Sequence, residues 1–217
     1  MADYKKPDYW QQKARKEGYP ARSVYKLAEI DEKFAVFKTN AAAKTAVFKV
    51  LDIGAAPGSW SLYVLRLMQK KIPGGNFLAA ADLSPLSREF DKGLFDNDNF
   101  FFVQGDVTTD DVRKTLLSKG PYNVIISDVA PNTTGNHMID SARSLELAET
   151  VVSYAEEALV PGGSLVLKIF QGSGVDNLLK RMKTLFTSAK SFKPQACRGE
   201  SVETYFIGLS RSGKIIV

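Results

Sequence analysis

The stretch Val47–Trp60, with the sequence VFKVLDIGAAPGSW, decides the fold of this chain. An apolar run typical of a β-strand ends at Asp52, and a loop of glycine, alanine and proline then opens a helix. In an open parallel α/β sheet, the first strand-to-helix turn lies at the carboxyl edge, where nucleotide-like ligands bind. Gly54 and Gly58 carry no Cβ, so the backbone of this loop can approach a ligand closely. The stretch therefore predicts an α/β fold with a ligand site at the loop.

The residues of this loop distinguish between kinds of nucleotide site. A dinucleotide-binding fold requires G-x-G-x-x-G, but Ala56 stands where the second glycine would be. A phosphate-cradling loop requires G-K-[ST], whereas the chain has Gly58-Ser59-Trp60, and Pro57 has no N–H to donate to a phosphate. We therefore expect a ligand with little phosphate, such as S-adenosylmethionine. A tight structural turn in another kind of α/β protein is the alternative.

Length and composition indicate a single globular domain. The chain has 217 residues, which is enough to bury a full core. Its one cysteine, Cys197, allows no internal disulfide, so we expect a cytoplasmic protein. We also expect a monomer. A single histidine, His137, cannot supply a zinc cluster, so no metal is expected. The N-terminus has no apolar signal segment and no run approaches membrane-spanning length, so no membrane association is expected.

Charge is distributed unevenly along the chain. Residues 1–38 hold nine Lys and Arg against six Asp and Glu, residues 39–163 hold eleven against fifteen, and residues 164–217 hold nine against three. An acidic middle between two basic ends suggests that both ends contact a polyanion. Lysines spread unevenly over a solvated surface would give the same pattern.

The first 38 residues combine basic and aromatic side chains. These are Tyr4, Lys5, Lys6, Tyr9, Trp10, Lys13, Arg15, Lys16, Tyr19, Arg22, Tyr25 and Lys26. Bases stack on aromatic rings and phosphates pair with Lys or Arg, so this composition is typical of an RNA contact. A helix that packs its aromatic residues on the domain is the alternative. Apolar residues from Val24 to Phe34 recur at helical spacing, with Ser23 as the cap. Lys26 lies off that stripe and, on helical grounds alone, is a solvated lysine.

Three strands of the predicted sheet end in an acidic residue. The first closes on Asp52, the second on Asp82 and the third, at 100–106, on Asp106. An acid after the second strand can accept hydrogen bonds from a ribose diol, and one after the third can hold an adenine amino group. Each acid alone is more often a turn or cap residue. Because parallel strand ends share one edge, the three together favour a common site.

The second half of the chain contains a charged residue in an apolar strand. Strand 123–130 runs into Asp128, and strand 164–170 contains Lys168. An unpaired lysine in a strand buried on both faces is costly, so Lys168 is anomalous unless it lies at a frayed end and reaches water. Glu203 begins the last strand and, if that strand is antiparallel, lies at the same edge. The other predicted elements are helices 139–159 and 175–186, an edge strand beginning at 190–193 and the last strand at 203–209.

Four charged residues remain once core and turn positions are accounted for, and their contexts match a known family. Lys26 lies in RSVYKL, Asp128 in ISDVAPN, Lys168 in VLKIFQG and Glu203 in SVETYFIG. Together with LDIGAAPGSW and the QGD that ends the third strand, these segments resemble the FtsJ-like (RrmJ-type) ribosomal RNA large-subunit 2′-O-methyltransferases, the RNA methyltransferase E type. The resemblance covers nearly the whole chain in order.

The resemblance implies a Rossmann-like S-adenosylmethionine-dependent methyltransferase fold: a seven-stranded, mostly parallel sheet with an antiparallel last strand and helices on both faces. It implies S-adenosylmethionine as the methyl donor and S-adenosylhomocysteine as the product. The acceptor would be a ribose 2′-hydroxyl in RNA, in the first instance a uridine of ribosomal RNA within the large subunit. Residues 39–217 would form the methyltransferase domain, and residues 1–38 a basic and aromatic extension that packs on it and faces RNA.

Donor-binding residues follow from the resemblance position by position. Gly58 and Trp60 match donor-contacting positions of the family's glycine loop, to which Gly54 also belongs. Asp82 matches the acid that binds the ribose of the donor, and Asp106 the acid on its adenine side.

The chain departs from the family pattern in two places. Ser59 replaces the second glycine of the usual pair before the tryptophan, and the alanine-rich connector at 41–45 is slightly longer than usual. The first departure concerns only fine detail of the donor pocket, and the second should not affect chemistry.

The resemblance also implies a catalytic tetrad of Lys26, Asp128, Lys168 and Glu203, in which Asp128 touches the donor as well. The attacking ribose hydroxyl must lose its proton, and a lysine can accept it only if its pKa falls from about 10.4 toward the working pH. Lys26 and burial would lower the pKa of Lys168, while the two acids would raise it, so the sequence leaves the direction open. Our hypothesis is that Lys168 accepts the proton and Asp128 orients it, while Lys26 and Glu203 hold the ribose.

Other functions stay open. Related enzymes with the same chemistry act on the anticodon loop of tRNA. The chain carries no recognisable appended RNA-binding domain, which favours a substrate presented in a large particle such as the large ribosomal subunit. A non-catalytic RNA-binding module belongs to a different class, and the presence of Lys168 and Asp128 argues against it. Ala56 disfavours a dinucleotide oxidoreductase.

Overall fold

The structure is a computed structural model that describes residues 9–38, 47–72, 75–199 and 201–213. Outside these ranges lie the expected connector at 41–45 and the N-terminal Tyr4, Lys5 and Lys6.

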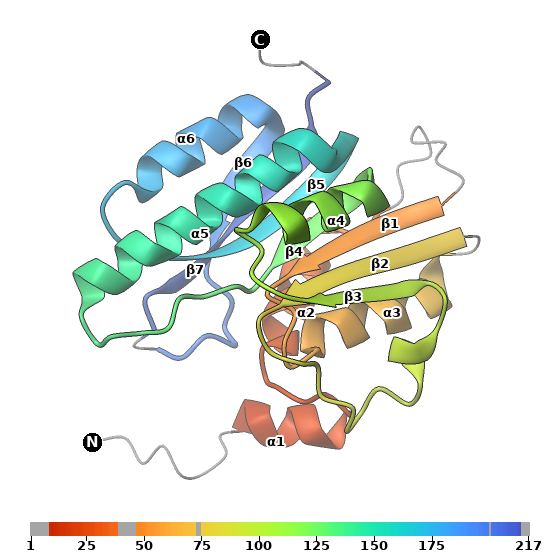
Figure 1. Ribbon diagram of the computed structural model, residues 1–217. Coiled ribbons are helices and arrows are strands. Elements are labelled where there is room, and N and C mark those ends of the chain that lie inside the picture. The colour runs from red at the N-terminus through yellow and green to blue at the C-terminus, as the bar shows by residue number, and fades with distance from the viewer. Residues whose placement is uncertain (1–8, 39–46, 73–74, 200, 214–217) are drawn as a thin grey trace.

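Seven strands of the described chain form one sheet. They are β1 (Val47–Ile53), β2 (Gly75–Asp82), β3 (Phe100–Gln104), β4 (Tyr122–Ser127), β5 (Leu159–Phe170), β6 (Phe186–Phe192) and β7 (Glu203–Arg211). Their order across the sheet is β3-β2-β1-β4-β5-β7-β6 (Figure 1). Neighbouring strands are parallel except at β7, which runs antiparallel to both β5 and β6. The predicted fold class, with an antiparallel last strand, is confirmed.

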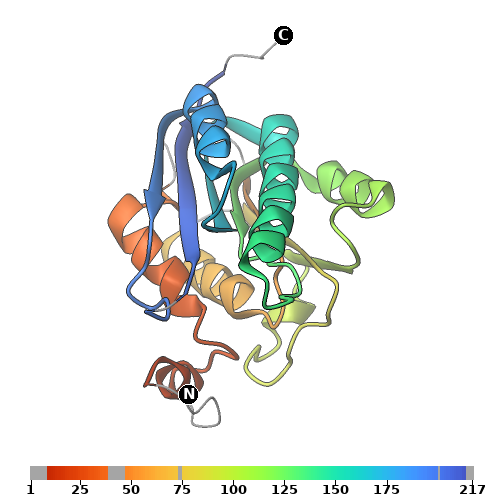
Figure 2. The same cartoon turned by 90° about the vertical axis from the view of Figure 1, so that its left-hand side faces the viewer.

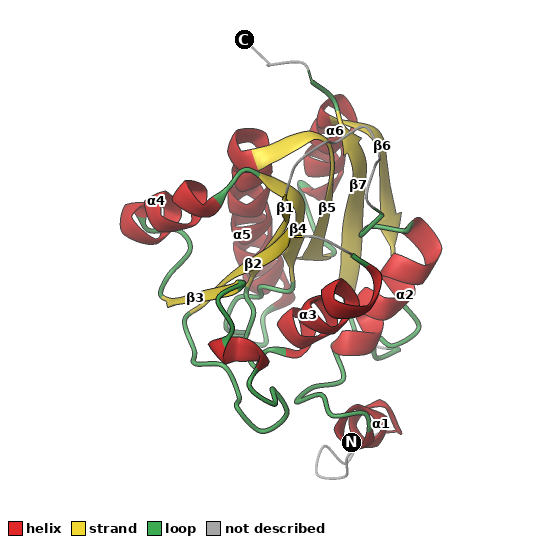
Figure 3. Cartoon of the chain, turned by 90° about the vertical axis from the view of Figure 1, so that its right-hand side faces the viewer, coloured by secondary structure: helices red, strands yellow, loops and turns green. Residues whose placement is uncertain are grey.

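Helices cover both faces of this sheet. The described helices are α1 (Tyr9–Lys16), α2 (Val24–Phe34), α3 (Ser59–Lys71), α4 (Asp110–Lys119), α5 (His137–Ala158) and α6 (Val175–Leu185), with a short 3-10 helix, η1, at Leu94–Asp96. The helix α1 lies apart from the sheet, next to the loops at one end of it (Figure 1 and Figure 2). Figure 3 shows α2 and α3 on one side of the sheet and α4, α5 and α6 on the other.

Two hydrophobic cores hold these layers together. In β1, Leu51 and Ile53 pack into the core beneath α5 and α6, while Val50 packs into the core beneath α2 and α3. Because side chains alternate along a strand, a strand buried on both faces reads as a continuous apolar run. Asp52 falls on the α3 side of the sheet and is fully buried there.

The strand directions bring the ends of several strands to one edge. The parallel strands β1 to β5 all finish there, and the antiparallel β7 begins there. The register pairs Phe170 with Glu203 and Lys168 with Tyr205. The conditional prediction that Glu203 lies at the edge of Asp128 and Lys168 is therefore confirmed. We call this edge the carboxyl edge.

Element boundaries differ from the sequence-based expectation at several strands. The fourth strand, β4, ends at Ser127 and not at 130, and the fifth, β5, begins at Leu159 and not at 164. The third strand, β3, ends at Gln104 and not at Asp106, which lies in the following turn. The edge strand β6 begins at Phe186 rather than at 190–193, because the preceding helix already ends at Leu185.

The sequence pattern leaves a helix as one of two alternatives for the N-terminal residues, where α1 lies, and misses α4. In α1 only Ala14 is buried, and in α4 only Leu116. A helix that fully buries a single residue is difficult to recognise from its sequence, because few apolar positions mark the face that packs on the domain.

Candidate active site

An ion pair joins Lys26 of α2 to Glu203 at the start of β7. The Lys26 Nζ lies 2.6 Å from the Glu203 Oε2, and Lys26 is only 7 % exposed. Burial acts to lower the pKa of Lys26, but the charges of Asp128 and Glu203 outweigh it and raise this pKa above its ordinary value. The expectation from helical spacing of a solvated lysine is wrong, because the side chain meets a partner from the other end of the chain.

A second ion pair explains the lysine inside the fifth strand. The Lys168 Nζ lies 3.1 Å from the Asp128 Oδ1, and it also donates to the backbone carbonyl of Asp128. Lys168 is 7 % exposed and lies within the ladder, opposite Tyr205. The alternative of a frayed strand end reaching water is therefore wrong. The charge is buried with a carboxylate partner, as a buried lysine requires.

A residue that the sequence reasoning missed connects the two pairs. The hydroxyl of Tyr205 donates to the Asp128 Oδ1 at 2.7 Å, and its ring centroid lies 5.9 Å from the Lys26 Nζ. Complete burial, together with the charges of Asp128 and Glu203, raises the pKa of Tyr205 well above its ordinary value, so its hydroxyl stays a donor. The available signal was its place two residues after Glu203, on the same face of β7.

The glycine loop packs directly against the segment that carries Asp128. Gly54 has φ +79°, and a Cβ there would lie 2.6 Å from the backbone of Val129. Gly58 has φ +107° and precedes the first turn of α3, where a Cβ would lie 3.0 Å from the ring of Phe95. Both positions require glycine, since other residues are strained at positive φ and a Cβ would crowd its neighbours. The loop and the ion pairs thus form one site.

The two predicted donor acids both lie at the carboxyl edge. The Asp82 Oδ2 accepts from the backbone N–H of Ala56 at 3.0 Å, which ties the end of β2 to the glycine loop. The Asp106 Oδ1 accepts from the backbone N–H and the hydroxyl of Thr108, and these bonds lower the pKa of Asp106. Asp106 is thus a turn residue ahead of α4 as well as a candidate ligand group.

Trp60 occupies a different place from the one expected of a donor contact. Its ring is 2 % exposed, and its Nε1 donates to the backbone carbonyl of Ser23 at 2.8 Å. The indole therefore packs between α2 and β7, where it lies 5.9 Å from the ring of Tyr205. What Trp60 offers a ligand is its backbone N–H, because the first N–H groups of a helix have no intrahelical partner. Its contact with a donor stays a prediction.

A buried carboxylate lies beneath the same loop. The Asp52 Oδ2 accepts from the hydroxyl of Ser61 at 2.7 Å, whereas its Oδ1 has no hydrogen-bond partner among the described residues. Burial raises the pKa of Asp52 to about 7 against the opposing effect of Ser61, and the charges of Asp128 and Asp82 raise it further. An unpartnered buried oxygen at this position fits a ligand that carries a polar hydrogen or a positive charge, as S-adenosylmethionine does.

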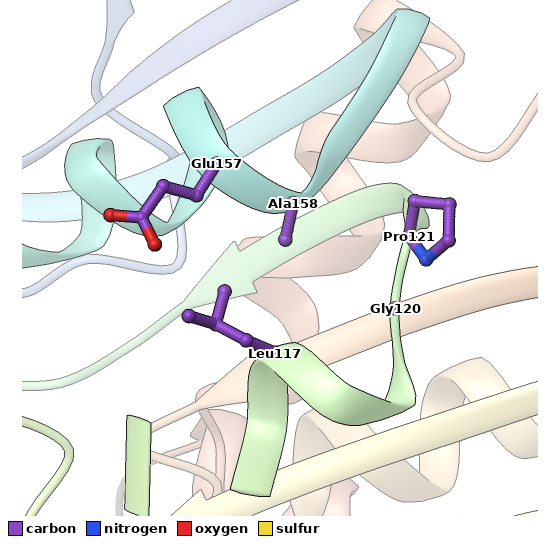
Figure 4. Close-up of a pocket in the computed structure, with 5 residues that line it drawn as sticks. All are labelled: Leu117, Gly120, Pro121, Glu157 and Ala158. Carbon is purple, nitrogen blue, oxygen red and sulfur yellow. The ribbon is translucent and has the colours of Figure 1, made fainter. Parts of the chain in front are cut away.

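The other end of the sheet offers no comparable chemistry. A hollow of about 310 Å³ lies there, lined by Leu117, Gly120, Pro121, Glu157 and Ala158 (Figure 4). The hollow lies at the start of β4, whereas the ion pairs lie beyond the end of that strand. The one charged residue of the hollow, Glu157, is already paired with Arg113.

In the described part of the chain, no three His, Cys, Asp or Glu side chains gather closely enough to hold a metal ion. Of the described helices, none has the length and apolarity needed to cross a bilayer.

Comparisons with known proteins point to one family. The family model for FtsJ-like methyltransferases matches residues 19–211. A Treponema denticola protein named Ribosomal RNA large subunit methyltransferase E is 47 % identical over 210 residues, covering 97 % of this chain and 98 % of that protein. An Oleidesulfovibrio alaskensis protein of the same name is 44 % identical, covering 95 % and 92 %.

Solved structures share the architecture. A crystal structure from Plasmodium falciparum, described as a ribosomal RNA methyltransferase, has a TM-score of 0.71 at 26 % identity and covers 90 % of this chain and 100 % of its own. Human methyltransferase-like protein 13 in complex with SAH has a TM-score of 0.51 at 16 % identity, with coverage of 78 % and 75 %, and shares the fold alone.

Proposed function

The chain belongs to the FtsJ-like methyltransferase family, and on that premise we propose that it transfers a methyl group from S-adenosylmethionine to a ribose 2′-hydroxyl in RNA. We propose ribosomal RNA within the large ribosomal subunit as the substrate, since the relatives with 44–47 % identity carry that name. The observation that carries the proposal is the pairing of two buried lysines with two carboxylates beside the glycine loop.

The donor would occupy the carboxyl edge above β1 and β2. Gly54, Gly58 and the backbone of Trp60 would line its path, Asp82 would bind its ribose and Asp106 would lie on its adenine side. Asp128 would touch the donor as well as the acceptor. S-adenosylmethionine supplies a methyl group on a positively charged sulfur, which is activated for in-line displacement. The unpartnered Oδ1 of Asp52 and the two crowded glycines support this placement.

The tetrad would position the acceptor hydroxyl and take its proton. The raised pKa of Lys26 keeps it protonated, which suits a role in holding the ribose together with Glu203. Lys168 would then accept the hydroxyl proton in its neutral form, after its own ammonium proton has been released to solvent. Asp128 orients Lys168 through its carboxylate and its backbone carbonyl, and Tyr205 holds that carboxylate in turn.

A methylation assay with labelled donor tests this function on intact large subunits, free ribosomal RNA and tRNA. Transfer is expected to the large subunit, and transfer to tRNA alone would overturn the preferred substrate. Lys168→Met should abolish transfer while calorimetry still detects donor binding. Lys49→Met is the matched control: Lys49 is also a strand lysine, but its Nζ donates to the backbone carbonyl of Lys119, away from the site. RNA binding without transfer to any substrate would indicate the non-catalytic alternative.

We also propose that the extension at residues 1–38 faces the RNA and that the protein acts as a cytoplasmic monomer. The described part of the extension is anchored by Ala14, which packs in a small cluster with Val24 and Tyr25. Since Tyr25 directly precedes Lys26, the extension lies next to the proposed acceptor site. Sedimentation of the purified protein tests the monomeric state, and a dimer would contradict it.

A further inference from the structure

The exposed hydrophobic side chains of this protein gather at one end. Among the described residues, the large hydrophobic side chains that are exposed are Tyr9, Leu83, Met138, Ile139 and Val202. Leu83 directly follows β2, Met138 and Ile139 begin the helix after β4, and Val202 directly precedes β7. All of these positions lie at the carboxyl edge. Isolated exposed hydrophobic residues need no explanation, but their confinement to the edge that carries the active site does.

Tyr9 stands on one side of this edge, at the outer end of an aromatic series. It is 69 % exposed, and its ring lies 5.4 Å from that of Trp10 in an edge-to-face contact. The Trp10 ring lies 5.1 Å from that of Tyr25, which directly precedes the tetrad residue Lys26. The series therefore leads from an exposed ring at the surface to the buried lysine of the site.

The helix that carries Tyr9 is anchored next to the donor side of the site. Arg15 of α1 pairs with Glu89, in the loop that follows β2, at 3.2 Å. Arg66 of α3 donates to the backbone carbonyls of both Gly18 and Phe90, at 2.9 and 3.1 Å, and so joins the turn after α1 to the same loop. The exposed ring of Tyr9 is thus part of a firmly attached element.

Met138 and Ile139 stand on the other side, on the first turn of α5. They are 79 % and 44 % exposed, while the next residue, Asp140, is buried and accepts from the backbone N–H of Thr134 at 2.8 Å. The same turn packs on the chain that follows β5, since a Cβ on Gly172 would lie 2.5 Å from the side chain of Ser141. The backbone that carries the two exposed side chains is therefore held in place by a packed turn.

Two neighbouring contacts connect this turn to the tetrad. Phe170, two residues after Lys168, donates its backbone N–H to the Ser144 hydroxyl of α5 at 3.0 Å. Gln171 donates its backbone N–H to the carbonyl of Val202, which precedes Glu203. Figure 1 and Figure 2 show α1 and the beginning of α5 at the same end of the molecule. Exposed hydrophobic groups thus flank the site on both sides.

The charge around Tyr9 identifies the kind of partner. The helix α1 carries Lys13, Arg15 and Lys16 and no acidic residue. The Lys13 Nζ lies 4.6 Å from the Tyr25 ring centroid, and Lys16 is exposed. Exposed aromatic rings beside basic side chains fit unpaired nucleotides, whose bases stack while their phosphates pair.

Building on the proposed function, we propose that Tyr9 and Met138 form the two sides of a rim that holds unpaired nucleotides on either side of the target ribose. Tyr9 stacks on one base, and Met138, with Ile139, makes apolar contact with another. Leu83 is not part of the rim, because it directly follows Asp82, which we assign to the donor. The rim requires the acceptor RNA to be unpaired around the methylated nucleotide.

Anisotropy titrations test the rim with an unpaired RNA oligonucleotide and with a duplex of the same sequence. Tyr9→Ala should weaken binding of the unpaired RNA about tenfold, while Tyr9→Phe should restore it, because stacking needs the ring and not the hydroxyl. Met138→Ser should weaken it several-fold and Met138→Leu should not. Duplex binding and donor affinity should be unchanged in all four variants, which also shows that they fold.

Lys16→Ala provides a matched comparison on the same helix. Loss of a phosphate contact should reduce the salt dependence of binding for unpaired RNA and duplex alike, whereas Tyr9→Ala should leave the salt dependence unchanged. Equal affinity of Tyr9→Ala and wild type for unpaired RNA would overturn the rim. So would a defect that appears only with an assembled particle, since this would indicate a protein contact.

The two proposals fail in different ways. If wild type methylates RNA and the rim variants bind and methylate it equally well, the rim is wrong and the proposed function stands. If wild type methylates no RNA but the variants lose affinity for unpaired RNA as described, the rim stands and the proposed function is wrong.

Discussion

The hydroxyl of Tyr205 donates to the Asp128 Oδ1 at 2.7 Å from a completely buried position on β7. The same oxygen lies 3.1 Å from the Lys168 Nζ. A carboxylate with two fixed donors has little freedom to rotate, so Tyr205 holds the group that we expect to orient the proton acceptor. Loss of the Tyr205 hydroxyl should therefore have a measurable effect on catalysis.

Replacement of Tyr205 by Phe removes this hydrogen bond without removing the ring. Because a hydrogen bond to a charged group contributes about 1.5–3 kcal/mol, kcat should fall about tenfold to a hundredfold. The KM values for donor and RNA should change little, and the pH–rate profile should shift. Steady-state kinetics at several pH values provides the measurement.

Tyr154→Phe is the matched control for this variant. Tyr154 is equally buried, and its hydroxyl donates to the backbone carbonyl of Val107 at 2.8 Å, away from the tetrad. It should lower stability and leave kcat unchanged. Equal kcat values for Tyr205→Phe and wild type would contradict a positioning role for Tyr205.

Glu203→Gln should weaken the fold in a pH-dependent way through Lys26. The pKa of Lys26 is raised in the folded state, so its stabilising contribution is fully present below the unfolded pKa of about 10.4 and is lost as pH rises through the folded pKa. At pH 8 the variant should lose about 2 kcal/mol of unfolding free energy. Above about pH 10.4 the difference from wild type should shrink. Urea unfolding across this range tests it, and a constant difference would count against the pairing.

Asp52→Asn should abolish a pH dependence of the unfolding free energy that the ligand-free wild type shows. The pKa of Asp52 is raised to about 7, so its contribution to stability is fully present below the unfolded pKa and is lost as pH rises through about 7. Wild type should therefore lose up to about 4 kcal/mol between pH 4 and pH 8 that Asp52→Asn does not lose. Urea unfolding of both proteins measures the difference.

Ser61→Ala provides an independent check on Asp52. The hydrogen bond from the Ser61 hydroxyl lowers the pKa of Asp52. Its loss in Ser61→Ala should therefore raise this pKa, and the pH-dependent loss of stability should move to a higher pH than in wild type. An unchanged midpoint in Ser61→Ala would show that another group causes the pH dependence.

Gly54→Ala should damage both the fold and donor binding. A Cβ at this position would lie 2.6 Å from the backbone of Val129, and the residue has φ +79°. Positive φ alone costs roughly 1–2 kcal/mol, and the displaced backbone adds to that. Gly93→Ala separates the two effects, since Gly93 has φ +78° and a Cβ there would meet nothing within 4 Å. Thermal unfolding and calorimetry with donor should show the larger stability loss, and the loss of affinity, only in Gly54→Ala.

Much of the fold was readable from local patterns. The stretch Val47–Trp60 predicted the first strand, the glycine loop and the following helix, and all three are present. The fifth strand and the last strand were predicted as well, because their apolar runs are continuous. The helix α4 was missed, and α1 remained one of two alternatives, because each fully buries a single residue and offers few apolar positions by which to recognise it.

The site was readable only in part. Family resemblance identified Lys26 and Glu203, yet helical spacing placed Lys26 in solvent, where it is not. Tyr205 was missed, because its place two residues after Glu203 puts it on the same face of β7 but does not show that its hydroxyl meets Asp128.

The sequence by itself determined the class of fold and the kind of loop at the carboxyl edge. Glycine, proline and strand alternation act on the chain within a few residues, and their effect does not depend on what packs nearby. The tertiary structure alone decided the state of the charged residues. Lys26 and Glu203 are 177 positions apart, and they meet because β7 runs antiparallel and starts where the parallel strands end. Burial and pairing across such a distance decide whether a lysine is solvated, protonated or able to accept a proton, and no local pattern contains that information.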